Sequence, residues 1–197
     1  MTAARLIVYG DFNCPFSALA SRRAAHLERL EIATVEWRAV EHAPDIPTQG
    51  RPVEGRLAAD YARELDMVRD LLAPGEADVL RLPPRLSNTR LVTARYAART
   101  DLRERLFAAY WHEGLDLGDE DTLTHLGAHD SDDATAARWH DEWRATGSVV
   151  IPTMVDGEGA IVPGFDALAH LAWLAAPRLR GDMGGEAPCF AHLLDDE

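Results

Sequence analysis

Cysteine is scarce in this chain of 197 residues. Only Cys14 and Cys189 occur, and they stand near opposite ends of the sequence. Two cysteines so far apart form neither the framework of a disulfide-stabilised secreted domain nor the clustered ligand spacing of a zinc site. Any cysteine chemistry therefore has to use one thiol at a time.

Long apolar runs and excess positive charge are also missing. No stretch approaches the roughly 20 apolar residues that cross a bilayer, and the chain does not open with a basic segment followed by an apolar one. The balance of 20 Lys and Arg against 33 Asp and Glu gives a formal net charge of −13, which repels nucleic acid and anionic lipid. We expect a soluble, cytoplasmic protein with neither nucleic acid nor membrane among its partners.

The first forty residues have the pattern of a strand, a helix and a second strand. A β-branched-rich run at Leu6–Tyr9 ends at Gly10, the spacing becomes helical from Pro15, and residues 32–40 again resemble a strand. A strand that follows a helical crossover pairs parallel to the first. The chain is therefore predicted to begin as an α/β fold.

The middle of the chain is predicted to be helical. Three prolines between residues 42 and 52 indicate a loop. Expected helices follow at residues 57–72, 87–99 (capped by Ser87), 102–111, 121–128 and 132–144. This stretch has the character of an insertion.

Strand patterns return after the insertion. Residues 149–151 and 153–155 look like strands, and a turn at 156–159 leads into another at 160–162, as in a hairpin. Asp166 is expected to cap a last helix through Leu174, and residues 177–197 to form a weakly structured tail.

The segment Asp11-Phe12-Asn13-Cys14-Pro15-Phe16-Ser17 is the strongest candidate for chemistry. Proline favours the first helical position, so Cys14 is expected at the N-cap, where free N–H groups and the helix dipole lower a thiol pKa. Ser17, one turn on, is placed to donate a hydrogen bond to the sulfur. The alternative is a buried cysteine that packs as a small apolar residue.

A second candidate is Ile151-Pro152-Thr153, where proline interrupts strand-like sequence. A cis Ile151–Pro152 bond would explain how proline fits into this strand-like sequence. It would lie opposite Cys14 and present the Ile151 backbone to a ligand. A trans proline on an edge strand is the alternative.

Other polar and aromatic residues are assigned no function. The eight histidines show no metal-ligand spacing, so no metal is expected, and the acidic stretch from 116 to 133 lacks calcium-loop spacing. Tryptophans are expected in the core, although Trp111 is a candidate for lining a groove beside the insertion.

Together these features resemble the DsbA-like branch of the thioredoxin superfamily, over about residues 6–174. Within it the chain is most similar to the cytoplasmic FrnE-like group. The resemblance rests on Cys14-Pro15-Phe16 with the basic pair Arg22-Arg23 further on, on Ser87-Asn88-Thr89-Arg90, and on the segment Phe107-Ala108-Ala109-Tyr110-Trp111-His112-Glu113-Gly114.

The resemblance implies a thioredoxin-like fold interrupted by an all-helical insertion. Residues 1–55 would form its first part, 56–144 the helical insertion, 145–176 its second part and 177–197 the tail. The catalytic residues would be Cys14 and Ser17, and the substrate-binding residues would be Pro15, Phe16, Ile151, Pro152 and Thr153.

The sequence departs from the family pattern at two places. Ser17 replaces the second motif cysteine, so no dithiol cycle can run through this motif. The segment 148–151 lacks the glycine-rich approach to the proline that is common in the group, which leaves the shape of the substrate groove open.

Three functions are compatible with this pattern. The first is a monothiol oxidoreductase, in which Cys14 exchanges with a protein or small-molecule disulfide and an external thiol such as glutathione or mycothiol resolves the product. The second is a thiol-dependent transferase or isomerase, similar to kappa-class glutathione transferases and 2-hydroxychromene-2-carboxylate isomerases. The third is a non-catalytic binding protein. No tightly bound cofactor is expected, and a homodimer is possible.

Overall fold

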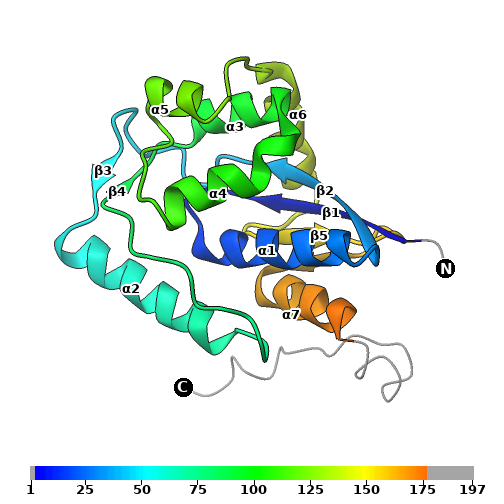
Figure 1. Ribbon diagram of the computed structural model, residues 1–197. Coiled ribbons are helices and arrows are strands. Elements are labelled where there is room, and N and C mark those ends of the chain that lie inside the picture. The colour runs from blue at the N-terminus through cyan, green and yellow to red at the C-terminus, as the bar shows by residue number, and fades with distance from the viewer. Residues whose placement is uncertain (1–2, 177–197) are drawn as a thin grey trace.

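A four-stranded sheet forms the centre of the computed structural model, which describes residues 3–176 (Figure 1). Its strand order is β2-β1-β5-β6. β1 (Ala4–Gly10) pairs parallel to β2 (Ala33–Ala39), with Val8 opposite Trp37. On its other side β1 pairs antiparallel to β5 (Thr153–Val155), which pairs antiparallel to β6 (Ile161–Pro163). The predicted parallel βαβ unit and the terminal hairpin are confirmed.

Two helices that lie far apart in the sequence pack side by side (Figure 1). They are α1 (Pro15–Arg29), which follows β1, and α7 (Gly164–Ala175), which follows β6. Both contribute buried leucines to the main core, where they meet the apolar side chains of β1 and β5. Because α1 begins shortly after β1 ends, its first turn lies at the carboxyl end of β1.

The segment between β2 and β5 is largely helical, as predicted. Its helices are α2 (Gly55–Asp70), α3 (Arg90–Ala98), the short 3₁₀ helix η1 (Thr100–Leu102), α4 (Arg103–Trp111), α5 (Glu120–His125) and α6 (Asp133–Ala145). A feature that the sequence analysis missed is a two-stranded antiparallel sheet of β3 (Arg51–Pro52) and β4 (Arg85–Leu86). α4 packs along α1, while α3 and α6 contact β2.

The helix expected from residue 87 begins at Arg90, with Thr89 as its N-cap. Ser87 cannot cap it, because its hydroxyl donates to Asp116 Oδ1 at 2.6 Å and accepts the Leu117 N–H at 3.0 Å. The prediction of Ser87 as a cap is therefore wrong.

Residues 149–151 are not a strand, contrary to the prediction. The Val150 carbonyl accepts the Thr153 hydroxyl at 2.6 Å and the Ser148 hydroxyl at 3.1 Å, so local side chains replace a strand partner. Asp166 was expected to cap the last helix, but α7 begins at Gly164 with Pro163 as its N-cap.

The predicted tail, with Cys189, lies outside the described residues. Between residues 3 and 176 no helix combines the length and the apolar composition that a membrane crossing requires.

One buried guanidinium joins three parts of the fold. Arg23 on α1 is only 4% exposed and forms an ion pair with Glu76 at 2.6 Å. Its other N–H groups donate to the carbonyls of Leu71, just after α2, and of Leu168 in α7. Arg23 therefore satisfies backbone carbonyls on two helices and a carboxylate on the following loop.

We expect Arg23→Met to destabilise the protein by about 3–5 kcal/mol, because it leaves a partly buried carboxylate and two carbonyls without a partner. Urea unfolding measures this loss. Arg56→Gln is the matched control, because Arg56 is 95% exposed and its contact to Asp60 is 3.8 Å long. Equal midpoints for the two variants would contradict the role assigned to Arg23.

Candidate active site

Cys14 occupies the N-cap of α1, as the sequence predicts. Its backbone is extended (φ −96°, ψ 122°), and Pro15 is the first helical residue. The Cys14 carbonyl accepts the Ala18 N–H at 3.0 Å, which is the first hydrogen bond of the helix. The thiol thus stands where β1 turns into α1.

The second candidate segment lies directly against this thiol. Cys14 Sγ is 4.0 Å from the Ile151 carbonyl oxygen, and the Ile151–Pro152 peptide bond is cis. Both features agree with the arrangement expected from the sequence. The backbone just before Pro152 therefore forms one wall beside the sulfur.

Two of the predicted substrate-binding residues differ in how they are exposed. Phe16 is half-buried, with its ring edge-on to Phe165 at 5.2 Å. Thr153 is fully buried, and its hydroxyl bonds Val150, Ser148 and the Trp143 indole N–H. Thr153 holds the loop in place and offers no surface to a ligand.

Ser17 is completely buried one turn after Cys14. Its hydroxyl oxygen accepts the Asp11 N–H at 3.3 Å, which ties the first turn of α1 to the end of β1. Gly10 is required beside it, because a Cβ there would lie 2.9 Å from Ser17 Oγ and 2.5 Å from the Trp37 ring. Ser17 is thus a structural part of the turn as well as a neighbour of the thiol.

The expected lowering of the Cys14 pKa is wrong. Burial raises the pKa of this thiol to about 11, and the negative charge of Asp11 acts in the same direction. Hydrogen bonds from the Ser17 hydroxyl and from the N–H groups of Ser17 and Phe16 lower the pKa but do not outweigh burial. The environment of this half-buried thiol therefore favours its protonated form.

Asp11 is a site residue whose role the sequence analysis did not assign. Its carboxyl group is fully buried and accepts the His42 N–H at 2.8 Å and the Asn13 N–H at 3.5 Å. Burial raises the pKa of Asp11 to about 6, against the effect of these donors. The sequence does contain a sign of this role, because Asp11 stands three residues before Cys14, just after the end of the first strand.

Polar side chains from the insertion hold the turn between β1 and α1. The Trp111 indole donates to the Phe12 carbonyl at 2.9 Å, and the Tyr61 hydroxyl donates to the Asn13 carbonyl at 3.1 Å. The Asn13 amide in turn donates to the Ser87 carbonyl at 3.2 Å. Trp111 is 1% exposed. It therefore holds the turn from the interior, and the expectation that it lines a groove is wrong.

His42 connects the turn to the loop before Pro152. Its backbone N–H binds Asp11, and its ring Nε2 lies 3.1 Å from the Val149 carbonyl. Val149 and Val150 are themselves exposed, at 79% and 44%. The loop before Pro152 thus carries two exposed apolar side chains. Within residues 3–176 no three His, Cys, Asp or Glu side chains are grouped closely enough to hold a metal ion.

Comparison with known proteins adds a family and several structural neighbours. The family model described as a DSBA-like thioredoxin domain matches residues 5–141. No curated protein matches the chain.

Three solved structures share the fold at low sequence identity. A probable DsbA oxidoreductase from Streptomyces coelicolor is 18% identical, with 94% of this chain and 92% of that chain covered and a TM-score of 0.62. A 2-hydroxychromene-2-carboxylate isomerase is 20% identical (93% and 100% covered, TM-score 0.59). The cytosolic disulfide reductase DsbM from Pseudomonas aeruginosa, solved with GSH, is 17% identical (88% and 94% covered, TM-score 0.52). These likenesses confirm the predicted thioredoxin-like α/β fold.

Alkylation of Cys14 should become faster with pH, because only the thiolate reacts. With a pKa of about 11, the rate with iodoacetamide should rise about tenfold per pH unit between pH 7 and 10. Peptide mass spectrometry follows Cys14 separately from Cys189. A rate that levels off below pH 8 would contradict the raised pKa.

The stability of the Asp11→Asn variant relative to wild type should increase as pH rises. An aspartate with a pKa of about 6 in the folded protein, against 3.8 as its ordinary value, contributes stability below pH 3.8 and loses it as pH rises through 6. The unfolding free energy of Asp11→Asn relative to wild type should therefore increase by about 2.4 kcal/mol from pH 4 to pH 8. A pH-independent difference in urea unfolding would show that Asp11 ionises normally.

Proposed function

Since the chain belongs to the DsbA-like thioredoxin domain family, we propose that it is a thiol–disulfide oxidoreductase that works through Cys14 alone. The observation that carries this proposal is the Cys14 sulfur at the start of α1, 4.0 Å from the Ile151 carbonyl. A thiol at this point has the Ile151 backbone beside it, which a substrate in an extended conformation can contact. The assignment to the cytoplasmic FrnE-like branch rests on the sequence motifs.

The proposed reaction has two exchange steps. Cys14 gives up its proton and attacks a disulfide R–S–S–R′, which forms Cys14–S–S–R and releases R′–SH. An external thiol R″–SH then attacks the sulfur of R, which releases Cys14 as a thiol and forms R–S–S–R″. Each step breaks one S–S bond and forms another, so no further oxidant or reductant is needed.

An external thiol is needed because nothing in the motif can resolve the mixed disulfide. Ser17 stands where the family motif has its second cysteine, and a hydroxyl cannot form a disulfide. Glutathione and mycothiol are the external thiols that we propose. The DsbM neighbour, solved with GSH, is consistent with the first.

The raised pKa of Cys14 determines which step is slow. A thiol with a pKa of about 11 is a strong nucleophile once deprotonated, but it is a poor leaving group. Release of Cys14 from the mixed disulfide should therefore be slower than its formation above neutral pH. The enzyme is expected to accumulate as the mixed disulfide during turnover.

Turnover of a small disulfide in the presence of glutathione tests the proposal. Wild type should consume glutathione, Cys14→Ala should not, and Cys189→Ser should match wild type, because the reaction uses Cys14 alone. Equal rates for wild type and Cys14→Ala would contradict the proposal.

Ser17→Cys should convert the site to a dithiol. Residues three apart lie one helical turn apart on the same face, within reach of a disulfide. Under oxidising conditions the variant should form a disulfide between Cys14 and the thiol introduced at position 17, seen as a linked peptide, and should show faster release of bound glutathione. Failure of this bond to form would mean that the two side chains do not face each other.

One observation favours a second function. A protonated thiol at neutral pH is better suited to orienting a bound thiol than to attacking a disulfide, as a glutathione-dependent transferase or isomerase requires. The isomerase among the structural neighbours has the same fold. Saturable glutathione binding that survives Cys14→Ala, without disulfide turnover by wild type, would favour this function.

A further inference from the structure

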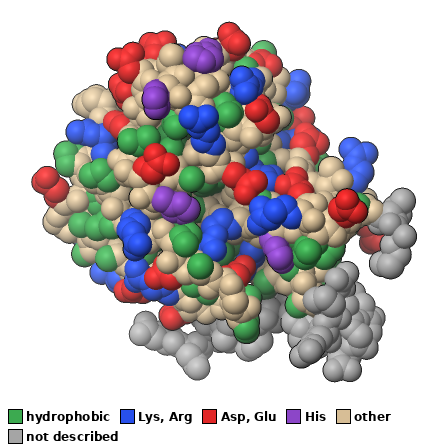
Figure 2. All heavy atoms as spheres, in the orientation of Figure 1, with side chains coloured by type: hydrophobic (Ala, Val, Ile, Leu, Met, Phe, Trp, Pro, Cys, Tyr) green, Lys and Arg blue, Asp and Glu red, His purple; other side chains and the backbone are tan. Residues whose placement is uncertain are grey.

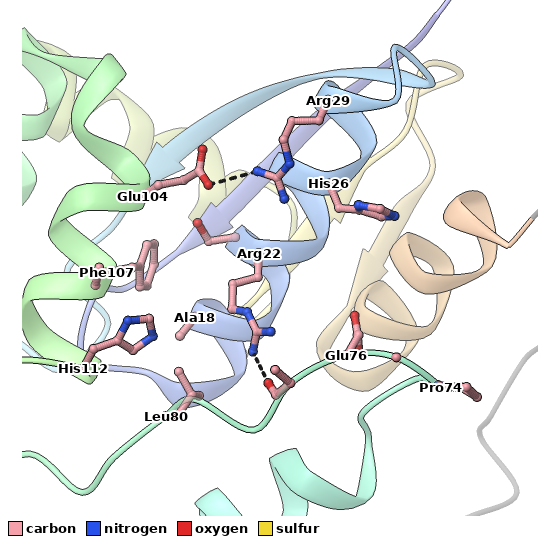
Figure 3. A pocket seen from close by; sticks show the side chains of 14 residues that line it. Ala18, Arg22, His26, Arg29, Pro74, Glu76, Leu80, Glu104, Phe107 and His112 are labelled. Atoms are coloured by element: carbon pink, nitrogen blue, oxygen red, sulfur yellow. Dashed lines mark hydrogen bonds and ion pairs between the residues drawn. The ribbon is translucent and has the colours of Figure 1, made fainter.

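A groove separate from the Cys14 site runs along the outer side of α1 (Figure 3). Its walls are α4 on one side and the loop around residues 74–80 on the other, and Cys14 is not among the residues that line it. The space is about 720 Å³, which is within the usual range for a small-molecule site.

Ion pairs neutralise most of the charges that border this groove. Arg29 reaches across to Glu104 at 3.2 Å, and Glu76 is occupied by the buried Arg23. On this face of the molecule, Arg and His side chains gather between Asp and Glu side chains (Figure 2). The charges of Glu104 and Glu76 are thus each balanced by an arginine.

Arg22 is different, because no ion pair links it to a carboxylate within residues 3–176. One of its guanidinium N–H groups donates to the Ala77 carbonyl at 2.9 Å. A guanidinium has five N–H donors, so the remaining ones are available. Figure 3 shows this half-buried side chain directed across the groove toward the loop.

The end of the groove beside Arg22 combines apolar surface with one more polar group. Leu80, Phe107 and Ala18 lie at its floor with at most 5% of each residue exposed, and the His112 ring points toward them (Figure 3). Within the described part of the chain the His112 ring has no hydrogen-bond partner. An apolar floor with two converging polar groups has the composition of a ligand site.

We propose that this groove binds a small organic carboxylate, with its carboxyl group on Arg22 and its apolar body against Leu80 and Phe107. The planar guanidinium matches a carboxylate in shape and charge, and it binds one more strongly than it binds a neutral group. Among the arginines of residues 3–176 that line this groove, Arg22 is the one without an ion pair, and its one positive charge favours a carboxylate over a phosphate dianion. The apolar floor adds affinity for an acid that carries a hydrocarbon chain.

The state of His112 is consistent with such a ligand. Burial lowers the pKa of His112, and the positive charges of Arg22 and Arg81 lower it further, against the opposing effect of Glu113. A carboxylate bound beside the ring would raise this pKa, because it offsets those positive charges. Binding should therefore move the titration of His112 to higher pH.

Hexanoate is the probe, with hexanamide as its neutral analogue and inorganic phosphate as an anion without an apolar body. We expect saturable NMR shifts of the His112 ring and of amides at residues 18–26 with hexanoate, weaker shifts with hexanamide, and none with phosphate at equal ionic strength. Equal responses to hexanoate and hexanamide, or displacement of hexanoate by phosphate, would overturn the proposal, as would the absence of saturation.

Variants separate this groove from the Cys14 site. Arg22→Gln should weaken hexanoate binding about tenfold or more, and Ala108→Phe, which fills the groove, should abolish it. Arg56→Gln changes the net charge equally and should leave binding unaltered, as should Cys14→Ala. Unchanged affinity in a folded Arg22→Gln protein would overturn the proposal, whatever the disulfide turnover assay shows.

Discussion

The turn between β1 and α1 can be buried only because distant parts of the chain supply hydrogen bonds to it. The carbonyls of Phe12 and Asn13 and the carboxyl group of Asp11 would otherwise lie unpaired in the interior, at a cost of about 1–3 kcal/mol each. Trp111, Tyr61 and the His42 backbone provide the missing partners. The helical insertion therefore does more than cover the sheet, because it holds the loop that carries the thiol.

Burial of this turn also decides the chemistry of Cys14. The N-terminus of α1 supplies N–H donors to the sulfur, yet removal from water and the nearby Asp11 carboxylate together raise the pKa to about 11. In the proposed mechanism, a thiol with such a pKa is a poor leaving group and is released slowly from a mixed disulfide. In the same mechanism, serine at position 17 offers no internal thiol to release the product. Both features favour a site that holds a thiol adduct rather than one that cycles quickly.

Local sequence patterns predicted the parts of the fold that depend on short-range physics. The start of α1 at Pro15, the parallel pairing of β1 with β2 and the turn after β5 follow from proline placement, a helical crossover and turn residues. The cis bond before Pro152 could be expected because proline interrupts a strand pattern there.

Long-range contacts explain where sequence reasoning failed. Ser87 has the character of an N-cap, but Asp116 occupies its hydroxyl. Residues 149–151 have β-branched side chains, but the Thr153 and Ser148 hydroxyls bond the carbonyl that a strand partner would need. The predicted lowering of the Cys14 pKa failed for the same reason. How much water reaches a helix N-terminus depends on which other parts of the chain pack over it.

The most direct test of the Cys14 mechanism is the intact mass of the protein after incubation with oxidised glutathione. A Cys189→Ser background restricts the reaction to Cys14. The mechanism predicts one glutathione per chain, an adduct that persists through removal of excess reagent and disappears with added thiol, and no adduct when Cys14→Ala is also present. Absence of the adduct at a pH where free cysteine reacts fully, or its retention without Cys14, would contradict the mechanism.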